Sequence, residues 1–150
     1  MEEREVLTWE QFGVATQAIA ADIRSSGFRP DVVLAIARGG LTVAGALAYA
    51  LDVKNCGSMN VELYTGVDQR LDVPIMLPPM LDLVEVAGLK VLIADDVADT
   101  GTTLQLVQKV LEEHVLEART AVLYQKPRSV IVADHSWKTS DRWIDFPWSS

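Results

Sequence analysis

The stretch VLIADDVADTGTTL, residues 91–104, joins an apolar run to three aspartates, a loop of small residues and the start of an amphipathic helix. The run at residues 91–94 does not alternate between apolar and polar side chains, which is typical of a strand covered on both faces. Leu104, Val107 and Leu111 then recur at helical spacing. The stretch therefore predicts a strand, a loop and a helix in succession, as in parallel α/β folds.

The loop in this stretch is suited to holding a phosphate. Residues 100–103 are small, so their backbone N–H groups can converge on an anion at the helix N-terminus, where the helix dipole favours negative charge. Asp95 and Asp96, which we place at the end of the strand, would repel a bare phosphate, so we expect them to meet sugar hydroxyls or a divalent cation. An ordinary connection with solvated or helix-capping aspartates would explain neither the clustered carboxylates nor the run of small residues.

A second unit of the same kind comes earlier in the chain. An apolar run at residues 32–37 leads into Arg38, Gly39 and Gly40, and helical spacing continues to Leu51. Taken alone, the glycine pair is equally consistent with a tight turn. Glycines also let the backbone approach a ligand, and arginine presents a fork of donors to phosphate oxygens. Ligands of parallel α/β sheets bind beyond the carboxyl ends of the strands, so both loops are expected at one edge of the sheet.

The whole pattern predicts an α/β fold with a mostly parallel central sheet flanked by helices. Thr8 and Gln11 have capping-box spacing, and the helix that they begin is expected to stop at Gly27. We expect further strands at residues 58–64, 83–86, 120–124 and 129–133.

Two segments are expected outside the central sheet. The segment at about residues 64–82 contains three prolines, which favours a loop or strand pair, and we interpret it as an active-site lid. Residues 137–150 carry three of the four tryptophans and are expected to dock as an irregular segment. His114 and His135 match no ligand spacing, and we interpret them as ordinary helix-end or surface residues.

Length and composition narrow the class of protein. A chain of 150 residues predicts one domain over residues 1–150, and a net charge of −8 argues against nonspecific nucleic-acid binding. Cys56 is the only cysteine, so neither a disulfide framework nor a thiolate metal cluster is expected. The N-terminus lacks the apolar core of a signal peptide, and the apolar run at residues 39–51 is too short for the ~20 residues of a membrane span. We expect a cytoplasmic protein.

Four motifs carry a resemblance to a known family. Residues 93–103, IADDVADTGTT, resemble the phosphoribosyl-pyrophosphate (PRPP) signature of the type I phosphoribosyltransferases, and residues 37–40 resemble their pyrophosphate loop. More narrowly, Lys126-Pro127 and the segment WIDFPW at residues 143–148 resemble the xanthine-guanine branch of the 6-oxopurine enzymes. The likeness runs from about Thr8 to the C-terminus, and it implies the type I fold with a small lid and a hood at about residues 134–150.

The resemblance implies roles for the PRPP-binding residues. Asp95 and Asp96 would hold the ribose hydroxyls, directly or through Mg²⁺, and Asp99 would be the catalytic acid or base at purine N7. The ribose and phosphate of PRPP would be bound by Asp95, Asp96, Asp99, Thr100, Gly101, Thr102 and Thr103. Arg38, Gly39 and Arg70 would bind pyrophosphate, and in this family the peptide before the residue at Arg38 is often cis.

The resemblance also implies a base-binding site. Lys126 would donate to the exocyclic oxygen at C6, and an ammonium donor selects that carbonyl over the amino group of adenine. Trp143 would stack on the base, and the backbone of Ile144 would contact the ring edge. The alternatives are a surface lysine at the end of a strand, and tryptophans that only seal the core.

The expected function is a Mg²⁺-dependent transfer of the phosphoribosyl group from PRPP to guanine, xanthine or hypoxanthine. Two departures from the family pattern keep alternatives open: Leu63-Tyr64 replaces Ser-Tyr at the entry of the lid, and Ser149-Ser150 stand near the place of another aspartate. The alternatives are a non-catalytic module that senses PRPP or a nucleotide, and a phosphoribosyltransferase for another acceptor. The family also implies a homo-oligomer, either a dimer or a tetramer.

Overall fold

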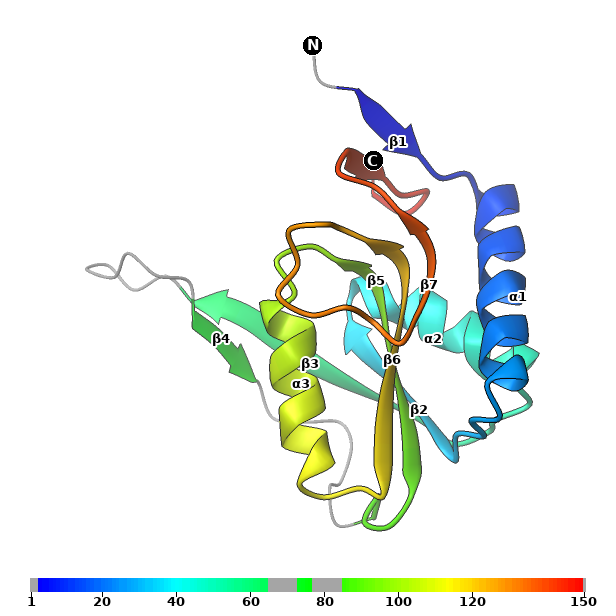
Figure 1. Cartoon of the computed structure of the whole chain (residues 1–150), viewed down its shortest axis with the longest axis vertical. Helices are drawn as coiled ribbons and strands as arrows, with labels where there is room; N and C mark the ends of the chain where they lie inside the picture. Colours follow the sequence, from blue (N-terminus) through cyan, green and yellow to red (C-terminus); the bar gives the residue numbers. More distant parts are fainter. Residues whose placement is uncertain (1–2, 65–72, 77–84, 150) are drawn as a thin grey trace.

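The computed structural model describes residues 3–64, 73–76 and 85–149 (Figure 1). Five parallel strands and one antiparallel edge strand form a six-stranded sheet in the order β4-β3-β2-β5-β6-β7, and β1 and β8 form a separate parallel pair. The elements are β1 (Arg4–Val6), α1 (Trp9–Ser25), β2 (Val32–Ala37), α2 (Gly39–Ala50), β3 (Cys56–Tyr64), β4 (Val73–Met76), β5 (Lys90–Ala98), α3 (Thr102–Glu112), β6 (Glu117–Gln125), β7 (His135–Thr139) and β8 (Trp143–Asp145).

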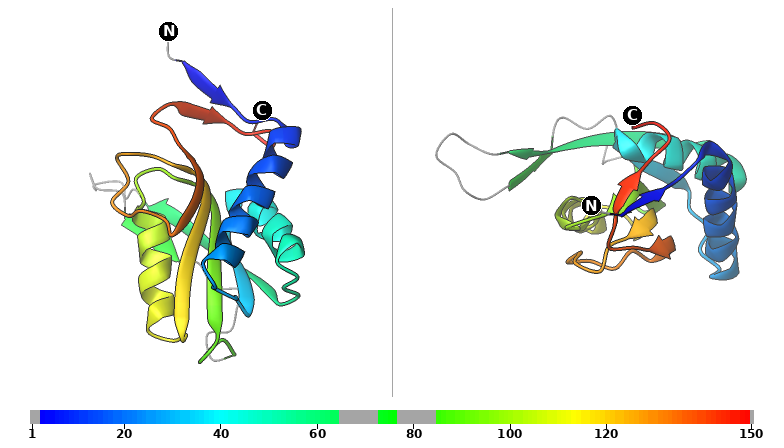
Figure 2. Two further views of the ribbon diagram at one scale, coloured as in Figure 1. Left: turned by 45° about the vertical axis from the view of Figure 1, so that its right-hand side comes forward. Right: turned by 90° about the horizontal axis from the view of Figure 1, so that it is seen from above.

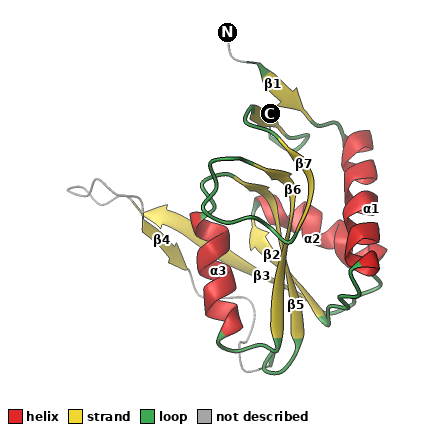
Figure 3. Cartoon of the chain, viewed as in Figure 1, coloured by secondary structure: helices red, strands yellow, loops and turns green. Residues whose placement is uncertain are grey.

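The order of the strands determines where a ligand can bind. The chain passes from β2 to β3 on one side and later adds β5 on the other side of β2, so the direction of winding reverses between β2 and β5. In open α/β sheets the binding crevice forms at such a switch point, beyond the carboxyl ends of the strands. The loops that follow β2 and β5 are the two loops that the sequence predicts to bind phosphates (Figure 3).

The sheet is covered on both faces, as the unbroken apolar runs predict. Val33 and Ala35 of β2 pack in a core with α1 and α2, whereas Val32, Leu34 and Ile36 pack in a second core with α3. Figure 2 shows the three helices distributed over the two faces in this way. The alternation of side chains along a buried strand thus supplies both cores.

Helix α1 begins as the sequence predicts. The Thr8 hydroxyl accepts a hydrogen bond from the Gln11 backbone N–H at 3.1 Å, and the Gln11 side chain accepts one from the Thr8 N–H at 3.1 Å. This reciprocal capping box satisfies two backbone donors that the first turn leaves free. None of the helices in the described part of the chain is long and apolar enough to cross a membrane.

A short parallel pair, β1 with β8, lies beyond the carboxyl edge of the main sheet (Figure 1). Arg4 donates to the Asp145 carboxylate at 2.9 Å, and the Leu7 N–H donates to the Asp145 carbonyl at 3.0 Å. Strand β1 was not predicted from the sequence, because three residues of mixed charge and polarity are too few to show the alternation of apolar and polar side chains that indicates a strand. The N-terminal segment therefore supports the hood.

Two predicted strands are wrong. Residues 129–133 form a loop, and the last strand of the sheet is β7 at 135–139. The side chain of Gln125 donates to the Ile131 carbonyl at 2.9 Å and accepts from the Ala133 N–H at 2.9 Å, so one side chain supplies bonds that a neighbouring strand would otherwise make. The strand expected at 83–86 is also wrong where it is described, because residues 85–86 lie in a turn.

The C-terminal segment is more regular than expected. Residues 137–150 were predicted to be irregular, but part of β7 and all of β8 lie in this segment. His135 is likewise not a surface residue: its side chain is buried, and Nδ1 lies 2.7 Å from the Asp22 carboxylate of α1. The contact between His135 and Asp22 joins β7 to α1. A single histidine forms no sequence pattern from which such a contact could be predicted.

The predicted lid is described only in part. Strand β4 pairs antiparallel with β3, with Val73 opposite Tyr64, so this part extends the central sheet, contrary to the prediction of a separate pair. Pro74 is tolerated because β4 is an edge strand. Residues 65–72 and 77–84, and with them Arg70, lie outside the described residues.

Candidate active site

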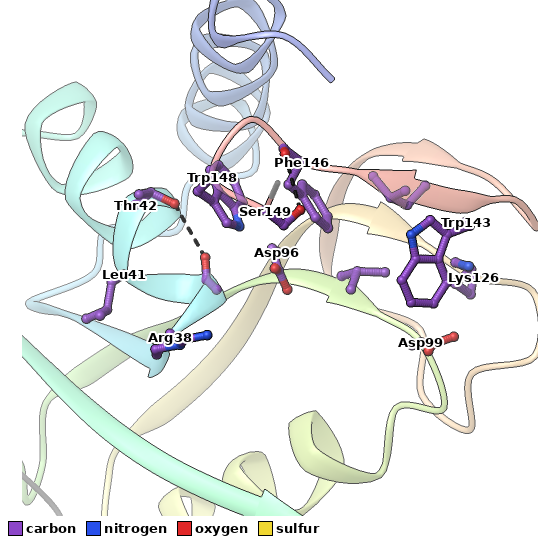
Figure 4. A pocket seen from close by; sticks show the side chains of 13 residues that line it. Arg38, Leu41, Thr42, Asp96, Asp99, Lys126, Trp143, Phe146, Trp148 and Ser149 are labelled. Carbon is purple, nitrogen blue, oxygen red and sulfur yellow. Dashed lines mark hydrogen bonds between the residues drawn. The ribbon is translucent and has the colours of Figure 1, made fainter. Parts of the chain in front are cut away.

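A cleft of about 770 Å³ opens at the carboxyl edge of the sheet, beside the switch point (Figure 4). It brings together residues from four separate parts of the chain. Its lining residues are Arg38, Gly39, Leu41, Thr42, Asp96, Val97, Asp99, Lys126, Trp143, Ile144, Phe146, Trp148 and Ser149. Seven predicted site residues therefore line one cavity, whereas Asp95 and residues 100–103 lie beside it and do not line it.

The acidic pair belongs to the strand and not to its end. Strand β5 continues to Ala98, so Asp95 and Asp96 alternate across the sheet. The Asp96 side chain faces the cleft, and Asp95 Oδ1 accepts a hydrogen bond from the Asp96 N–H at 2.8 Å. We predicted that the strand would end at Asp95 and Asp96, which is too early. The reason is that a pair of carboxylates is unusual within a buried strand.

Burial perturbs both carboxyl groups. Burial raises the pKa of Asp95 well above its ordinary value, and the neighbouring charge of Asp96 raises it further. Burial also raises the pKa of Asp96, while hydrogen bonds from Asp95, from the Val97 backbone and from the Trp148 side chain partly offset that effect. Asp96, the member of the pair that faces the cleft, is thus suited to a ligand that brings hydroxyl donors or positive charge.

The loop after β2 packs directly against the acidic strand. A Cβ atom on Gly39 would collide with the Asp96 carboxylate, and one on Gly40 would come closer than 3.0 Å to the Ala94 carbonyl oxygen. The peptide between Ala37 and Arg38 is cis. Only glycine at these two positions lets α2 begin so close to β5, which places the Arg38 side chain at the cleft.

The loop after β5 forms the N-terminus of α3. Gly101 has φ +82°, the left-handed conformation that glycine adopts readily. A Cβ atom there would also collide with Ser129 and lie 2.9 Å from Ile131. The Thr100 and Thr102 hydroxyls are 3.1 Å apart, and the Thr102 N–H donates to the Thr100 hydroxyl at 3.4 Å. The other N–H groups of the first turn have no acceptor within the helix and can meet an anion.

Asp99 has a partner that the sequence did not reveal. The Arg128 guanidinium donates to Asp99 Oδ1 from Nε at 2.8 Å and from Nη2 at 2.5 Å. Arg128 follows Lys126 by two residues, in the loop after β6, and no spacing rule links that loop to Asp99. Only the fold brings the two segments together.

Aromatic residues form the wall opposite the strands. Trp143 of β8 is 58% exposed and lies beside Lys126 (Figure 4). Phe146 and Trp148 stack with centroids 4.9 Å apart and also line the cleft, whereas Trp137 packs on Tyr124 in the core. Trp137 therefore fits the interpretation of the tryptophans as core residues. Trp148 both packs against the core and lines the cleft, whereas Trp143 lines the cleft with an exposed side chain.

Comparison with known proteins assigns this arrangement to a family. The model of the phosphoribosyl transferase domain matches residues 3–150. The chain is a phosphoribosyltransferase. A xanthine-guanine phosphoribosyltransferase of Nitratidesulfovibrio vulgaris is 34% identical, over 96% of this chain and 83% of that protein. Another from a Ruegeria species is 31% identical, over 95% of this chain and 83% of that protein.

The structural comparison agrees with the sequence comparison. A purine phosphoribosyltransferase from Pyrococcus horikoshii superposes with a TM-score of 0.86 and 33% identity, over 100% of this chain and 95% of that chain. A xanthine-guanine-hypoxanthine phosphoribosyltransferase from Helicobacter pylori has a TM-score of 0.82 at 24% identity, which shows the shared fold. The predicted fold of this phosphoribosyltransferase and the resemblance to the xanthine-guanine branch are confirmed.

Proposed function

We propose that this phosphoribosyltransferase transfers the 5-phosphoribosyl group of PRPP to guanine, xanthine or hypoxanthine and releases pyrophosphate, in purine salvage. One observation carries the proposal: Asp96, Asp99, Lys126 and Trp143 line the same cleft. This reaction needs four groups, which these residues would supply in the same order: a carboxylate beside the sugar, a catalytic acid or base, a donor for the purine carbonyl and an aromatic surface. The similar proteins named for xanthine and guanine support the choice of base.

The reaction needs binding and charge stabilisation more than a nucleophile. Transfer from PRPP develops positive charge at the ribose, so the enzyme must hold the leaving group and orient the acceptor. Asp95 and Asp96 would hold the ribose hydroxyls, and the backbone of residues 100–103 would hold the 5′-phosphate. Arg38 and Gly39 would bind pyrophosphate, and the same role for Arg70 stays a prediction from the sequence.

We also propose dependence on Mg²⁺, held by Asp95 and Asp96 either directly or through the ribose hydroxyls. No group of three or more potential metal ligands occurs among the described residues. Mg²⁺ commonly binds through one or two carboxylates together with substrate phosphates, so the acidic pair fits this ion. When bound, the ion would neutralise charge on pyrophosphate, and its charge would favour ionised carboxyl groups whose pKa burial has raised.

The base would lie between the aromatic wall and the two polar side chains. Lys126 would donate to the carbonyl oxygen at C6, Trp143 would stack on the ring, and the Ile144 backbone would contact the ring edge. Asp99 would accept or donate the proton at N7. The half-exposed side chains of Asp99 and Lys126 lie in the cleft and are accessible to a base.

Pyrophosphate release with PRPP, Mg²⁺ and a panel of purines and pyrimidines tests the proposal. We expect Asp99→Asn to lower kcat by about 10² to 10⁴-fold with little change in the KM for PRPP, and Asp95→Asn with Asp96→Asn to raise that KM. Lys126→Gln should weaken discrimination against adenine, and Lys109→Gln, on the exposed face of α3, is the matched control.

The same assays separate the alternatives. Calorimetric binding of PRPP without pyrophosphate release from any acceptor would identify a sensing module and refute catalysis. Turnover with another acceptor only would refute the choice of base.

The cellular and oligomeric state are further parts of the proposal. We propose a cytoplasmic homo-oligomer, a dimer or tetramer, as the family resemblance implies. Exposed apolar side chains such as Val14 of α1 and Tyr49 of α2 are compatible with a subunit contact. Light scattering after size-exclusion chromatography measures the mass, and a mass of one chain at micromolar concentration would refute the oligomer.

A further inference from the structure

We infer that Arg128 is a positioning residue, which fixes the carboxylate of Asp99 so that only one of its oxygens is available to the base. The inference rests on the proposed function of Asp99. It goes beyond that function because it assigns a role to a residue outside the motifs of the family resemblance. Three features of the structure carry it: the geometry of the ion pair, the anchoring of its loop and the exposure of both partners.

The ion pair uses one oxygen of the carboxylate. Nε and Nη2 of Arg128 both donate to Asp99 Oδ1, at 2.8 and 2.5 Å. Within the described part of the chain, Asp99 Oδ2 takes part in no hydrogen bond. Two donors on one oxygen fix the direction of the carboxylate, and the second oxygen is left to exchange a proton with a ligand in the cleft.

The loop that carries Arg128 is attached on both sides of Asp99. The Lys126 N–H donates to the Ala98 carbonyl at 3.0 Å, and the Val130 N–H donates to the Thr100 carbonyl at 2.8 Å. The neighbours of Asp99 in sequence thus bind the residues two positions before and after Arg128. Backbone hydrogen bonds therefore bring the guanidinium and the carboxylate together independently of their charges.

Exposure argues that the pair is not there mainly for stability. The side chains of Arg128 and Asp99 are 65% and 43% exposed. Ion pairs at such exposure contribute little to folding, because water screens the attraction and ordering two side chains costs entropy. The ion pair can instead serve to hold Asp99 in place, because small displacements of a catalytic group slow a reaction strongly.

Lys126 and Arg128 share this loop, which links the two halves of base recognition. Lys126 is placed to meet the C6 carbonyl, and Arg128 orients the group assigned to N7. Both side chains hang from a loop held by Ala98 and Thr100, directly beside the phosphate-binding turn. Lys126, the donor to the purine, and Asp99, the proposed catalytic acid or base, thus keep fixed positions relative to the PRPP site.

Kinetics of Arg128→Gln test the inference. We expect kcat to fall about 10- to 100-fold, the range for a misplaced group, with the KM for PRPP unchanged within about twofold. Arg128→Lys, which keeps the charge but offers one nitrogen, should be intermediate. The double variant Arg128→Gln with Asp99→Asn should be no slower than Asp99→Asn alone, because the arginine acts through that carboxylate.

Arg119→Gln is the matched control. Arg119 also forms an ion pair, with Glu117 at 2.8 Å, but it does not line the cleft. Its kcat should equal that of the wild type. An additive double variant, or a raised KM for PRPP in Arg128→Gln, would show that Arg128 binds the substrate directly and would overturn the inference. An unchanged kcat in Arg128→Gln would overturn it as well.

A structural readout separates this inference from the proposed function. Crystal structures of the wild type and of Arg128→Gln should show one orientation of the Asp99 carboxylate in the first and several in the second. If Asp99 keeps its single orientation without Arg128, the inference is wrong whether or not the wild type turns over. A wild type that orders Asp99 through Arg128 but releases no pyrophosphate would refute only the proposed function.

Discussion

Gly40 and Gly45 both lie in α2, yet the same change to alanine should have opposite effects. A Cβ atom at Gly45 meets nothing within 4 Å, whereas at Gly40 it would come closer than 3.0 Å to the Ala94 carbonyl oxygen, well inside the 3.4 Å at which ordinary contact begins. That oxygen belongs to the backbone of β5 and cannot rotate away. Gly40→Ala must therefore separate α2 from β5.

The magnitudes follow from helix propensity and packing. Alanine in place of glycine inside a helix gains about 0.5–1 kcal/mol, so Gly45→Ala should raise the free energy of unfolding by that amount. Gly40→Ala has the same gain but also an overpacking cost of about 1–3 kcal/mol. The net result should be a loss of up to about 2.5 kcal/mol, and the KM for PRPP should rise because Gly39 and Asp96 move apart.

Urea denaturation of the two variants and the wild type measures the effect. Equal m-values would show that the midpoints report stability. If Gly40→Ala is as stable as Gly45→Ala and binds PRPP as the wild type does, then the close approach of α2 to β5 does not constrain this position. That result would refute the role given to Gly40.

Two further predictions concern the acidic pair. Burial raises the folded-state pKa of Asp95 and Asp96, so the wild type should gain stability as the pH falls through those values toward the ordinary 3.8 and lose it as the pH rises. Asp95→Asn with Asp96→Asn should therefore be more stable than the wild type at neutral pH, with the difference narrowing in acid; urea titrations at several pH values measure this, and a pH-independent difference would contradict it. Trp148→Phe keeps an aromatic ring against Phe146 but removes the indole donor toward Asp96, so calorimetry should show PRPP bound severalfold more weakly, and unchanged affinity would show that the donor is dispensable.

The sequence predicts the parts of the fold whose physics is local. The runs at residues 32–37 and 91–94 are apolar without alternation, and the capping box at Thr8 needs only four residues, so these elements are confirmed. Residues 129–133 show the limit, because this apolar stretch is a loop that the Gln125 side chain holds from β6, with Ala133 buried and Val130 and Val132 exposed. Composition alone does not separate that arrangement from a strand.

The candidate site shows the same division. The family motifs predicted Asp96, Asp99 and Lys126, which lie in one cleft, because their spacing is fixed within single strand-to-loop units. Arg128 was missed because Asp99, the residue that it contacts, is far away in the sequence. Contacts of this kind depend on how strands are ordered in the sheet, and no pattern within one segment records that order.

The pairing of β1 with β8 has a consequence for biosynthesis. Arg4 and Asp145, joined by a hydrogen bond, are separated by 141 positions in the chain. Contacts between such distant segments form late, because closing the intervening chain costs entropy that earlier packing must first offset. On the ribosome, β1 has no partner until residues 143–145 have been synthesised. The loops after β2 and β5, which we propose to bind phosphate, can therefore form before the β1–β8 pair, which carries the Trp143 side chain proposed to stack on the base.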